Sequence, residues 1–221
     1  DRSPSRGLGD VYKRQYQEIE WPLAPTQLSA ADKEHPMLVD ATPVTPRKIL
    51  VTGADGQLGR ALRRVWNDQQ ADFFGHEEFD ITDIPELDFS GYWAIVNCAA
   101  YNDVNGAETD RAAAWATNAD APATLAAIAN EHDLTLVHVS SDYIFDGTRE
   151  LHPEHEPASP LSAYGASKAA GDTAAQVARK HYVVRTAWVF GEGSNFMATM
   201  ARLAANGVQP NAVSYTHLTL P

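Results

Sequence analysis

The strongest candidates for catalysis are a tyrosine and a lysine, Tyr164 and Lys168, in the segment Tyr-Gly-Ala-Ser-Lys. A spacing of four residues places both side chains on the same face of a helix. A lysine cation stabilises phenolate relative to phenol, so a tyrosine beside it can exchange a proton with a substrate oxygen near neutral pH. The pair therefore predicts acid–base chemistry, although this spacing alone often arises by chance.

A hydroxyl group for the same site is predicted where an apolar segment ends. Residues 137–139 are mostly apolar, and Ser140 and Ser141 follow them directly. Ligands of open α/β sheets bind at the carboxyl ends of the strands. A hydroxyl there, from Ser140 or Ser141, could hydrogen-bond a substrate carbonyl as charge develops on its oxygen. The alternative is that these serines cap the next segment, as serines at strand ends often do.

A glycine-rich segment at residues 52–59 follows an apolar run and opens a helical pattern. Its glycines permit a tight turn, close approach of a pyrophosphate to the backbone, and close packing of the helix on a sheet. The helix N-terminus offers free N–H groups to the phosphates. The spacing is Gly-x-x-Gly-x-x-Gly, not the stricter Gly-x-Gly-x-x-Gly, but its context predicts a site for NADH or NADPH. The predicted cofactor-binding residues in this segment are Gly53, Gly56, Gln57, Leu58 and Gly59.

An acidic residue, Asp80, lies 21 positions after Gly59. At about this distance an acidic group can bind the ribose or adenine of a dinucleotide, so Asp80 and its neighbour Ile81 are assigned to the cofactor. Alternatively, Asp80 caps a helix or turn. The mixture of histidine and glutamate at residues 76–78 leaves the preference between NAD and NADP open.

The elements that would position these residues alternate between strands and helices. Apolar runs predict strands at residues 48–52, 71–74, 93–98, 134–139 and 182–188. Helical spacing predicts helices at residues 58–66, 112–132, 164–180 and 195–206. Uniformly apolar strands that alternate with helices are typical of an α/β fold with a doubly wound parallel sheet, Rossmann-type.

The composition excludes several classes of protein. The formal charge of −12 argues against a nucleic-acid groove, which needs a basic face. No run of about 20 apolar residues predicts a membrane span. The single cysteine, Cys98, forms no internal disulfide and fits a buried core position in a reducing compartment, so the expected location is cytoplasmic. No residues are assigned to a metal.

Both ends of the chain are expected to be foreign to the natural protein. The codons GAT GTG TAT AAG AGA CAG can encode residues 10–15, and their opposite strand in another frame encodes Val-Ser-Tyr-Thr-His, which is the sequence of residues 213–217. Residues 1–15 and 213–221 thus look like one inverted sequencing adapter, and we expect them to have no function. Residues 47–212 would then be an incomplete domain with a truncated C-terminal substrate region.

Five segments in order carry a resemblance to a known family: the glycine loop, Asn-Cys-Ala-Ala-Tyr at 97–101, Ser-Ser-Asp-Tyr-Ile-Phe-Asp-Gly at 140–147, the Tyr164–Lys168 pair, and Arg-Thr-Ala-Trp-Val-Phe-Gly at 185–191. This set resembles the dTDP-4-dehydrorhamnose reductases, which are extended short-chain dehydrogenases. The resemblance covers residues 47–207.

The resemblance implies roles for particular residues. Ser141 would take the place of the family's usual threonine and complete a triad with Tyr164 and Lys168. The sugar nucleotide would contact Ser141, Asp142, Tyr143 and Trp188, and the cofactor would be lined by Ala99, Ala100 and Tyr101 in addition to Tyr164 and Lys168. One departure is Asn105, where many relatives have aspartate. The alternative role for Trp188 is core packing.

The proline-rich residues 16–46 read as a linker. The sequence Glu-Trp-Pro-Leu at 20–23, with residues 28–33 and 35–36, resembles the carboxyl tail of a dTDP-4-dehydrorhamnose 3,5-epimerase. The parent gene would then encode an epimerase–reductase fusion. No epimerase active-site residue is assigned.

The resemblance implies reduction by NADH or NADPH of the 4-keto group of dTDP-4-dehydro-L-rhamnose, a small nucleotide-sugar substrate, to dTDP-L-rhamnose. One alternative is a nucleotide-sugar epimerase or dehydratase of the same fold, although Tyr143 stands where a dehydratase has glutamate. Another is a non-catalytic regulatory subunit that binds dinucleotide, against which the intact triad argues. A homodimer is compatible with the sequence, and the fragment by itself is expected to be inactive.

Overall fold

The computed structural model describes residues 46–193 and 195–208, and the chain divides into two units after Pro46. The predicted adapter-like ends, residues 1–15 and 213–221, lie outside the described residues. So does the predicted linker with its epimerase-like segment, up to residue 45. These three assignments stay predictions, and the described elements all belong to the second unit.

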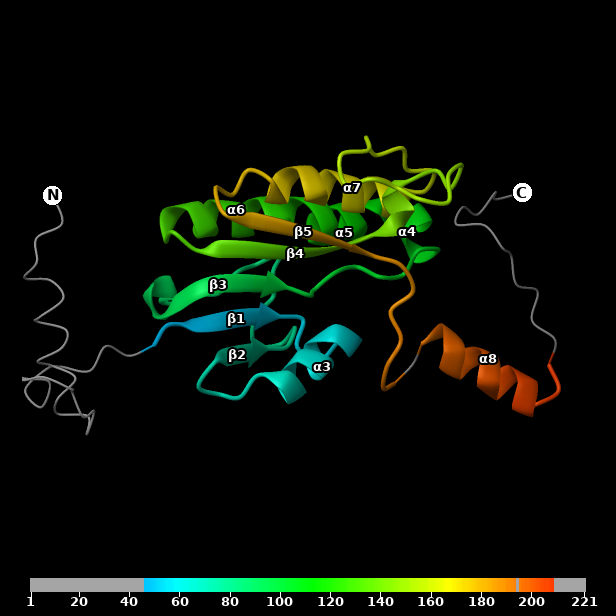
Figure 1. The fold of residues 1–221 in the computed structure, drawn as a ribbon, viewed down its shortest axis with the longest axis horizontal. Helices are drawn as coiled ribbons and strands as arrows, with labels where there is room; N and C mark the ends of the chain where they lie inside the picture. Colours follow the sequence, from blue (N-terminus) through cyan, green and yellow to red (C-terminus); the bar gives the residue numbers. More distant parts are fainter. Residues whose placement is uncertain (1–45, 194, 209–221) are drawn as a thin grey trace, which may run out of the picture. The chain divides into compact units, whose positions relative to one another are not determined.

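In the described residues, five strands alternate with helices (Figure 1). The strands are β1 (Lys48–Thr52), β2 (Ala71–Phe74), β3 (Tyr92–Asn97), β4 (Thr135–Ser141) and β5 (His181–Thr186). The helices are α3 (Gln57–Val65), α4 (Gly106–Thr109), α5 (Arg111–Trp115), α6 (Ala121–Glu131), α7 (Ala163–Ala175) and α8 (Phe196–Ala205). A π-helical turn, Ala116–Asp120, joins α5 to α6, and 3₁₀ turns lie at Phe89–Gly91 and Asp142–Ile144.

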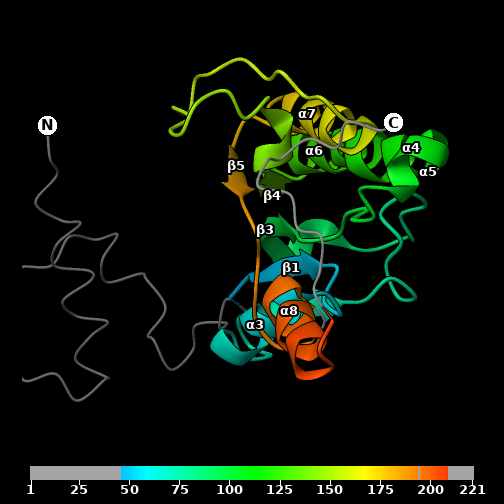
Figure 2. The ribbon, with the colours of Figure 1, turned by 90° about the vertical axis from the view of Figure 1, so that its right-hand side faces the viewer.

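The five strands form one parallel sheet in the order β2-β1-β3-β4-β5. The chain runs outward from β1 to β2 and then returns to β3 on the other side of β1, so the direction of winding reverses there. Helix α3 covers one face of the sheet, and α5, α6 and α7 cover the other (Figures 1 and 2). The predicted doubly wound α/β fold is therefore confirmed. All five carboxyl ends meet at one edge, where such folds bind ligands.

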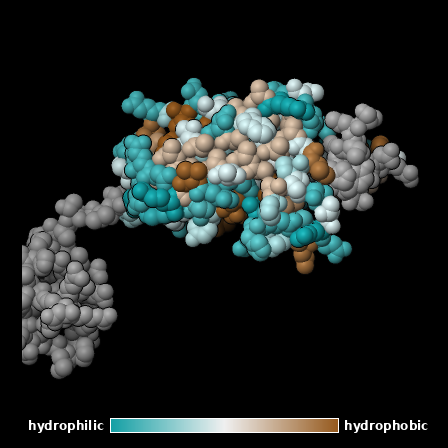
Figure 3. All heavy atoms as spheres, turned by 90° about the horizontal axis from the view of Figure 1, so that it is seen from above, coloured by the Kyte–Doolittle hydropathy of each residue, from teal (hydrophilic) through white to brown (hydrophobic). Residues whose placement is uncertain are grey.

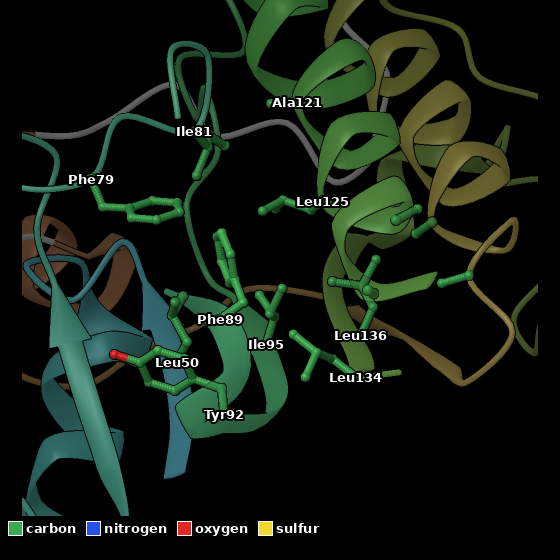
Figure 4. Close-up of a cluster of buried hydrophobic side chains, with 14 residues drawn as sticks. Leu50, Phe79, Ile81, Phe89, Tyr92, Ile95, Ala121, Leu125, Leu134 and Leu136 are labelled. Atoms are coloured by element: carbon green, nitrogen blue, oxygen red, sulfur yellow. The ribbon is translucent and has the colours of Figure 1, made fainter. Parts of the chain in front are cut away.

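The central strands β1 and β3 are buried on both faces, which explains their nearly continuous apolar runs, whereas β5 at the edge of the sheet is partly exposed. Leu50, Ile95 and Leu136 point to the side of α6 and pack with Leu125 (Figure 4). The alternating residues, which include Val51, pack towards α3. Two helical layers thus hold the sheet rigid beneath its carboxyl edge.

Small residues let α7 pack closely against the π-helical turn. A Cβ added to Gly171 would collide with the carbonyl oxygen of Asn118. Alanines make up much of α6 and α7, and the view onto this side of the molecule shows residues of moderate hydropathy flanked by hydrophilic ones (Figure 3). Close packing here fixes the position of α7 against the π-helical turn. This helix carries Tyr164 and Lys168.

The single helix predicted at residues 112–132 is wrong in one respect, because the π-helical turn interrupts it. Pro122, near the start of α6, has no N–H to donate to the carbonyl of Asn118 four residues earlier. The missing bond favours a local i+5 pattern, the usual form of a π-bulge. The bulge directs the Asn118 side chain into the protein, where it is 1% exposed.

The helix predicted at residues 164–180 ends earlier, at Ala175. The side chain of Asn130 donates to the Val177 carbonyl at 3.0 Å and accepts from the Arg179 N–H at 2.8 Å. The Asn130 side chain thus takes up backbone groups of Val177 and Arg179 that would be paired within the helix if α7 continued. Within the described segments, every helix is too short or too polar to cross a membrane.

Candidate active site

The glycine loop joins β1 to α3 at the carboxyl edge of the sheet. Gly53 has φ +65°, and a Cβ there would lie 2.6 Å from the backbone nitrogen of Ala99. Gly56 is the N-cap of α3, and a Cβ on Gly59 would lie 2.5 Å from the Cα of Ala54. The loop therefore packs against the segment after β3, and the first turn of α3 holds no acidic residue that would oppose an anion.

A cavity of about 420 Å³ lies beside this loop. It is lined by Gly53, Asp55, Gly56, His76, Phe79, Asp80, Ile81, Thr82, Cys98, Ala99, Ala100, Tyr101, Asn102 and Thr117. We call it the adenosine cavity, because it contains Asp80, the residue predicted to bind the ribose or adenine of a dinucleotide. The structure thus brings Asp80 and Ile81 together with Ala99, Ala100 and Tyr101, as the site prediction requires.

The position of Asp80 is compatible with both of the roles that the sequence left open. Its Oδ1 atom accepts hydrogen bonds from the backbone N–H of Thr82 at 2.8 Å and from the Thr82 hydroxyl at 2.7 Å. These bonds lower the pKa of the Asp80 carboxyl. The residue therefore caps a turn and also lines the adenosine cavity.

A second cavity, of about 300 Å³, lies next to the first. It is lined by Gly56, Gln57, Leu58, Cys98, Ala100, Asn102, Val139, Ser140, Ser141, Tyr164, Lys168, Thr186, Ala187 and Val189. We call it the catalytic cavity. Gly56, Cys98, Ala100 and Asn102 line both cavities, so one continuous path leads from Asp80 past the N-terminus of α3 to Tyr164.

Tyr164 lies in the first turn of α7, which begins after Ser162. The Ser162 hydroxyl accepts from the backbone N–H of Gly165 at 3.0 Å and so fixes the start of this helix. Tyr164 is 7% exposed, and this burial raises the pKa of its phenol. A hydrogen bond with Ser141 acts in the opposite direction.

Lys168 lies one turn further along α7 and is 2% exposed. Its ammonium group donates to the carbonyl oxygen of Val139 at 2.7 Å. Burial lowers the pKa of Lys168 to about 8, although the charge of Asp172 works against this shift. A buried cation in the same cavity as Tyr164 is suited to stabilise a phenolate.

The structure separates the two serines that the sequence left as alternatives. The Ser141 hydroxyl donates to Oδ1 of Asp142 at 3.2 Å and accepts from the N–H of Tyr143 at 3.2 Å, and it is close enough to Tyr164 to lower the pKa of its phenol. The Ser140 hydroxyl is buried and has no hydrogen-bond partner among the described residues. Ser141 is therefore the hydroxyl next to the tyrosine, and it also caps the following 3₁₀ turn.

The three other residues expected at the sugar nucleotide lie in different places. The Tyr143 ring contacts Tyr164 edge-on, with 5.7 Å between the ring centroids. Asp142 lines a third cavity, of about 710 Å³, which runs along β5. Trp188 is 50% exposed and packs on Phe196, so it is neither a core residue nor part of the catalytic cavity.

A row of polar residues across the sheet was missed by the sequence analysis. Thr52 pairs in register with Asn97, and Asn97 with His138. The Thr52 hydroxyl donates to Oδ1 of Asn97 at 2.7 Å, and Nδ2 of Asn97 lies 3.2 Å from Nδ1 of His138. The same Oδ1 accepts from the N–H of Ala99, so the row holds a residue that lines the adenosine cavity. Burial lowers the pKa of His138 to about 3, which keeps its ring neutral.

Asn118 was also missed. Its side chain accepts from the Tyr101 N–H at 2.9 Å and donates to the Tyr101 carbonyl at 3.1 Å. It donates as well to the Ser167 hydroxyl at 3.0 Å. Asn118 thereby ties the cofactor-lining segment at Tyr101 to α7. Among the described residues, no three His, Cys, Asp or Glu side chains are grouped as a metal site would require.

The parallel sheet, the glycine loop and the continuous pair of cavities at its carboxyl edge define a domain of the Rossmann-like class. Residues 47–218 match the family model described as the RmlD substrate binding domain. The chain belongs to this family.

Named relatives agree with this assignment. The chain is 40% identical over 171 residues to a dTDP-4-dehydrorhamnose reductase of Mycobacterium tuberculosis, covering 72% of this chain and 56% of that protein. It is 40% identical over 165 residues to a dTDP-4-keto-6-deoxy-D-glucose reductase of Streptomyces niveus, covering 70% and 57%. The structure of the dTDP-4-dehydrorhamnose reductase of Bacillus anthracis in complex with NADP matches with a TM-score of 0.65 and 32% identity, covering 73% of this chain and 60% of that chain. The chain thus spans little more than half the length of these relatives.

Proposed function

We propose that the complete protein reduces the 4-keto group of dTDP-4-dehydro-L-rhamnose to dTDP-L-rhamnose with NADH or NADPH. The observation that carries the proposal is the placement of Ser141, Tyr164 and Lys168 in a cavity that continues into the glycine-loop cavity. A dinucleotide on this path has its phosphates at the N-terminus of α3 and its reactive ring beside Tyr164. The names of the relatives support the choice of substrate.

The residues of the chain have distinct tasks in this reaction. A reduced nicotinamide, when bound, supplies the hydride. The Ser141 hydroxyl donates a hydrogen bond to the substrate carbonyl oxygen and holds it next to Tyr164. Tyr164 donates its phenolic proton to that oxygen as negative charge develops on it. Lys168 stabilises the resulting phenolate and thus offsets the effect of burial on the tyrosine.

The test is NADH or NADPH oxidation by the complete protein in the presence of the 4-keto sugar. Tyr164→Phe removes the proton donor, so we expect turnover to fall by about 10³-fold while cofactor affinity is unchanged. Tyr182→Phe is the matched control, because Tyr182 lies on β5 and is 65% exposed. Undiminished turnover in Tyr164→Phe would exclude this tyrosine as the acid.

The same assay separates the other functions that the sequence left open. An epimerase or dehydratase would convert a nucleotide sugar without net oxidation of the reduced cofactor. A regulatory subunit would bind the cofactor without turnover. The roles of Asp142, Tyr143 and Trp188 at the sugar nucleotide, a homodimer, and a cytoplasmic location stay predictions.

A further inference from the structure

The adenosine cavity is lined by acidic residues at the point where the ribose of a dinucleotide would lie. A dinucleotide in the two cavities would have its phosphates at the N-terminus of α3, next to Gly56, and its adenine towards Asp80 and Ile81. Its ribose would span the distance between them. Asp55 lines this stretch of the cavity, one residue before Gly56.

The carboxylate of Asp55 reaches across to the end of β2. A Cβ added to Gly75, the residue after β2, would collide with its Oδ2 atom. A second carboxylate, that of Glu78, also lies next to Gly75 and accepts from its N–H at 2.7 Å. In the described part of the chain, no side chain donates a hydrogen bond to the Asp55 carboxylate. Its two oxygens are therefore free to accept from a ribose hydroxyl.

The neighbouring cations are engaged elsewhere. The Arg60 guanidinium donates to the carbonyl oxygens of Asp55 and Glu192. Arg63 lies over the Phe73 ring, 5.1 Å from its centroid, and Arg64 pairs with Glu192. Among the described residues that line the adenosine cavity there is no lysine or arginine, and the sole basic side chain is His76, whose Nε2 lies 4.0 Å from Asp80.

We propose that this chain binds NADH in preference to NADPH, and that Asp55 sets the preference. The inference rests on the proposed function, because it requires a dinucleotide in the two cavities. The Asp55 carboxylate accepts a hydrogen bond from the ribose 2′-hydroxyl of NADH. NADPH has at this position a phosphate with nearly two negative charges, which would share the cavity with Asp55 and Asp80 and meet no lysine or arginine among the residues that line it. Repulsion and an unpaired carboxylate both weaken its binding.

The experiment is a fluorescence titration of the 221-residue chain with NADH and with NADPH. We expect the Kd for NADPH to exceed that for NADH by about tenfold, and added salt to narrow this ratio because it screens the repulsion. Asp55→Asn keeps the size of the side chain and removes its charge. In this variant, we expect the ratio of the two Kd values to fall by about tenfold, mainly through tighter binding of NADPH.

Two variants and one outcome control the interpretation. Asp68→Asn removes an equal charge from the exposed loop before β2, at the opposite end of the strand, and should leave the ratio unchanged. If the unmodified chain binds NADPH as tightly as NADH or more tightly, the proposal is overturned. In that case, weaker binding of NADPH by Arg60→Gln would assign the 2′-phosphate to the Arg60 guanidinium. An unchanged ratio in Asp55→Asn overturns the role of Asp55. If neither nucleotide binds, the proposed function of this domain fails together with the preference.

Discussion

The two cavities at the edge of the sheet are built from different kinds of groups. The adenosine cavity is shaped by backbone, at Gly53 and Gly56, and by a carboxylate at its rim, Asp80, whose side chain is 37% exposed. The catalytic cavity is lined by polar side chains that are almost fully buried, among them Tyr164 and Lys168. At the first site, substitutions should change ligand affinity through shape and surface charge. At the second, they should change pKa values and stability, because buried charges interact strongly.

The largest effect is expected from Gly53→Ala in the backbone-shaped cavity. The new Cβ would occupy a left-handed conformation and lie 2.6 Å from the nitrogen of Ala99. We expect the free energy of unfolding to fall by about 3 kcal/mol and the Kd for NADH to rise by about 100-fold. Urea denaturation and fluorescence titration measure the two quantities.

A matched glycine gives the control for this prediction. A Cβ on Gly91 would meet no atom within 4 Å, so Gly91→Ala should change neither quantity. Wild-type NADH affinity in Gly53→Ala would show that the close approach of β1 to the segment after β3 is unnecessary for the site.

The second prediction concerns the buried charge of the catalytic cavity. Because burial lowers the pKa of Lys168 from 10.5 to about 8, the unfolded chain binds this proton more tightly than the folded chain. The folded state therefore bears the full cost of the buried charge below pH 8, and its stability rises as the pH increases from 8 towards 10.5. Lys168→Met removes the titrating group while keeping an unbranched chain of similar size.

We expect the stability of the wild type relative to Lys168→Met to increase by about 2 kcal/mol between pH 7 and pH 9.5. Urea denaturation at several pH values measures this difference. Parallel pH profiles for the two proteins would show that Lys168 is not desolvated in the folded state. Lys180→Met is the control, since Lys180 is half-exposed and pairs with Asp133 at the surface.

The third prediction tests the link between the two cavities. Asn118→Ala removes three hydrogen bonds and leaves the Tyr101 N–H and carbonyl without their partner. We expect a loss of about 2 kcal/mol in the free energy of unfolding and faster amide hydrogen exchange at Tyr101. Asn206→Ala, at the exposed end of α8, is the control. Unchanged exchange at Tyr101 would contradict the role of Asn118 as a clamp.

The sequence was sufficient for those features that depend on local patterns. Strand β1 was predicted with its observed limits, because a short apolar run before a glycine loop has few alternatives. The pair of Tyr164 and Lys168 was found from its helical spacing together with two other local patterns, the glycine loop and the serines that follow an apolar run. The interruption of the helix at Ala116–Asp120 was not predicted from the sequence, because it depends on Pro122 together with contacts to α7, about fifty residues away.

The polar row beneath the cavities shows a different limit. Asn97 and His138 each stand within apolar strands, and such positions were a visible signal of a buried network. Which polar residues meet, however, depends on the register between β3 and β4, and no local pattern specifies it. The sequence could not distinguish Ser140 from Ser141 for the same reason. Which of the two lies beside Tyr164 depends on the position of α7 over the end of β4.

The smallest effects should separate these two serines. The Ser141 hydrogen bond lowers the pKa of Tyr164, so Ser141→Ala should raise it. Ser140→Ala removes a buried hydroxyl that has no partner among the described residues, so it should leave the pKa of Tyr164 unchanged and alter the free energy of unfolding by less than about 1 kcal/mol. Ultraviolet titration of tyrosinate, with Tyr164→Phe as the reference that lacks the signal, measures both shifts. An equal shift in the two serine variants would mean that the phenol senses the general polarity of the cavity and not a hydrogen bond from Ser141.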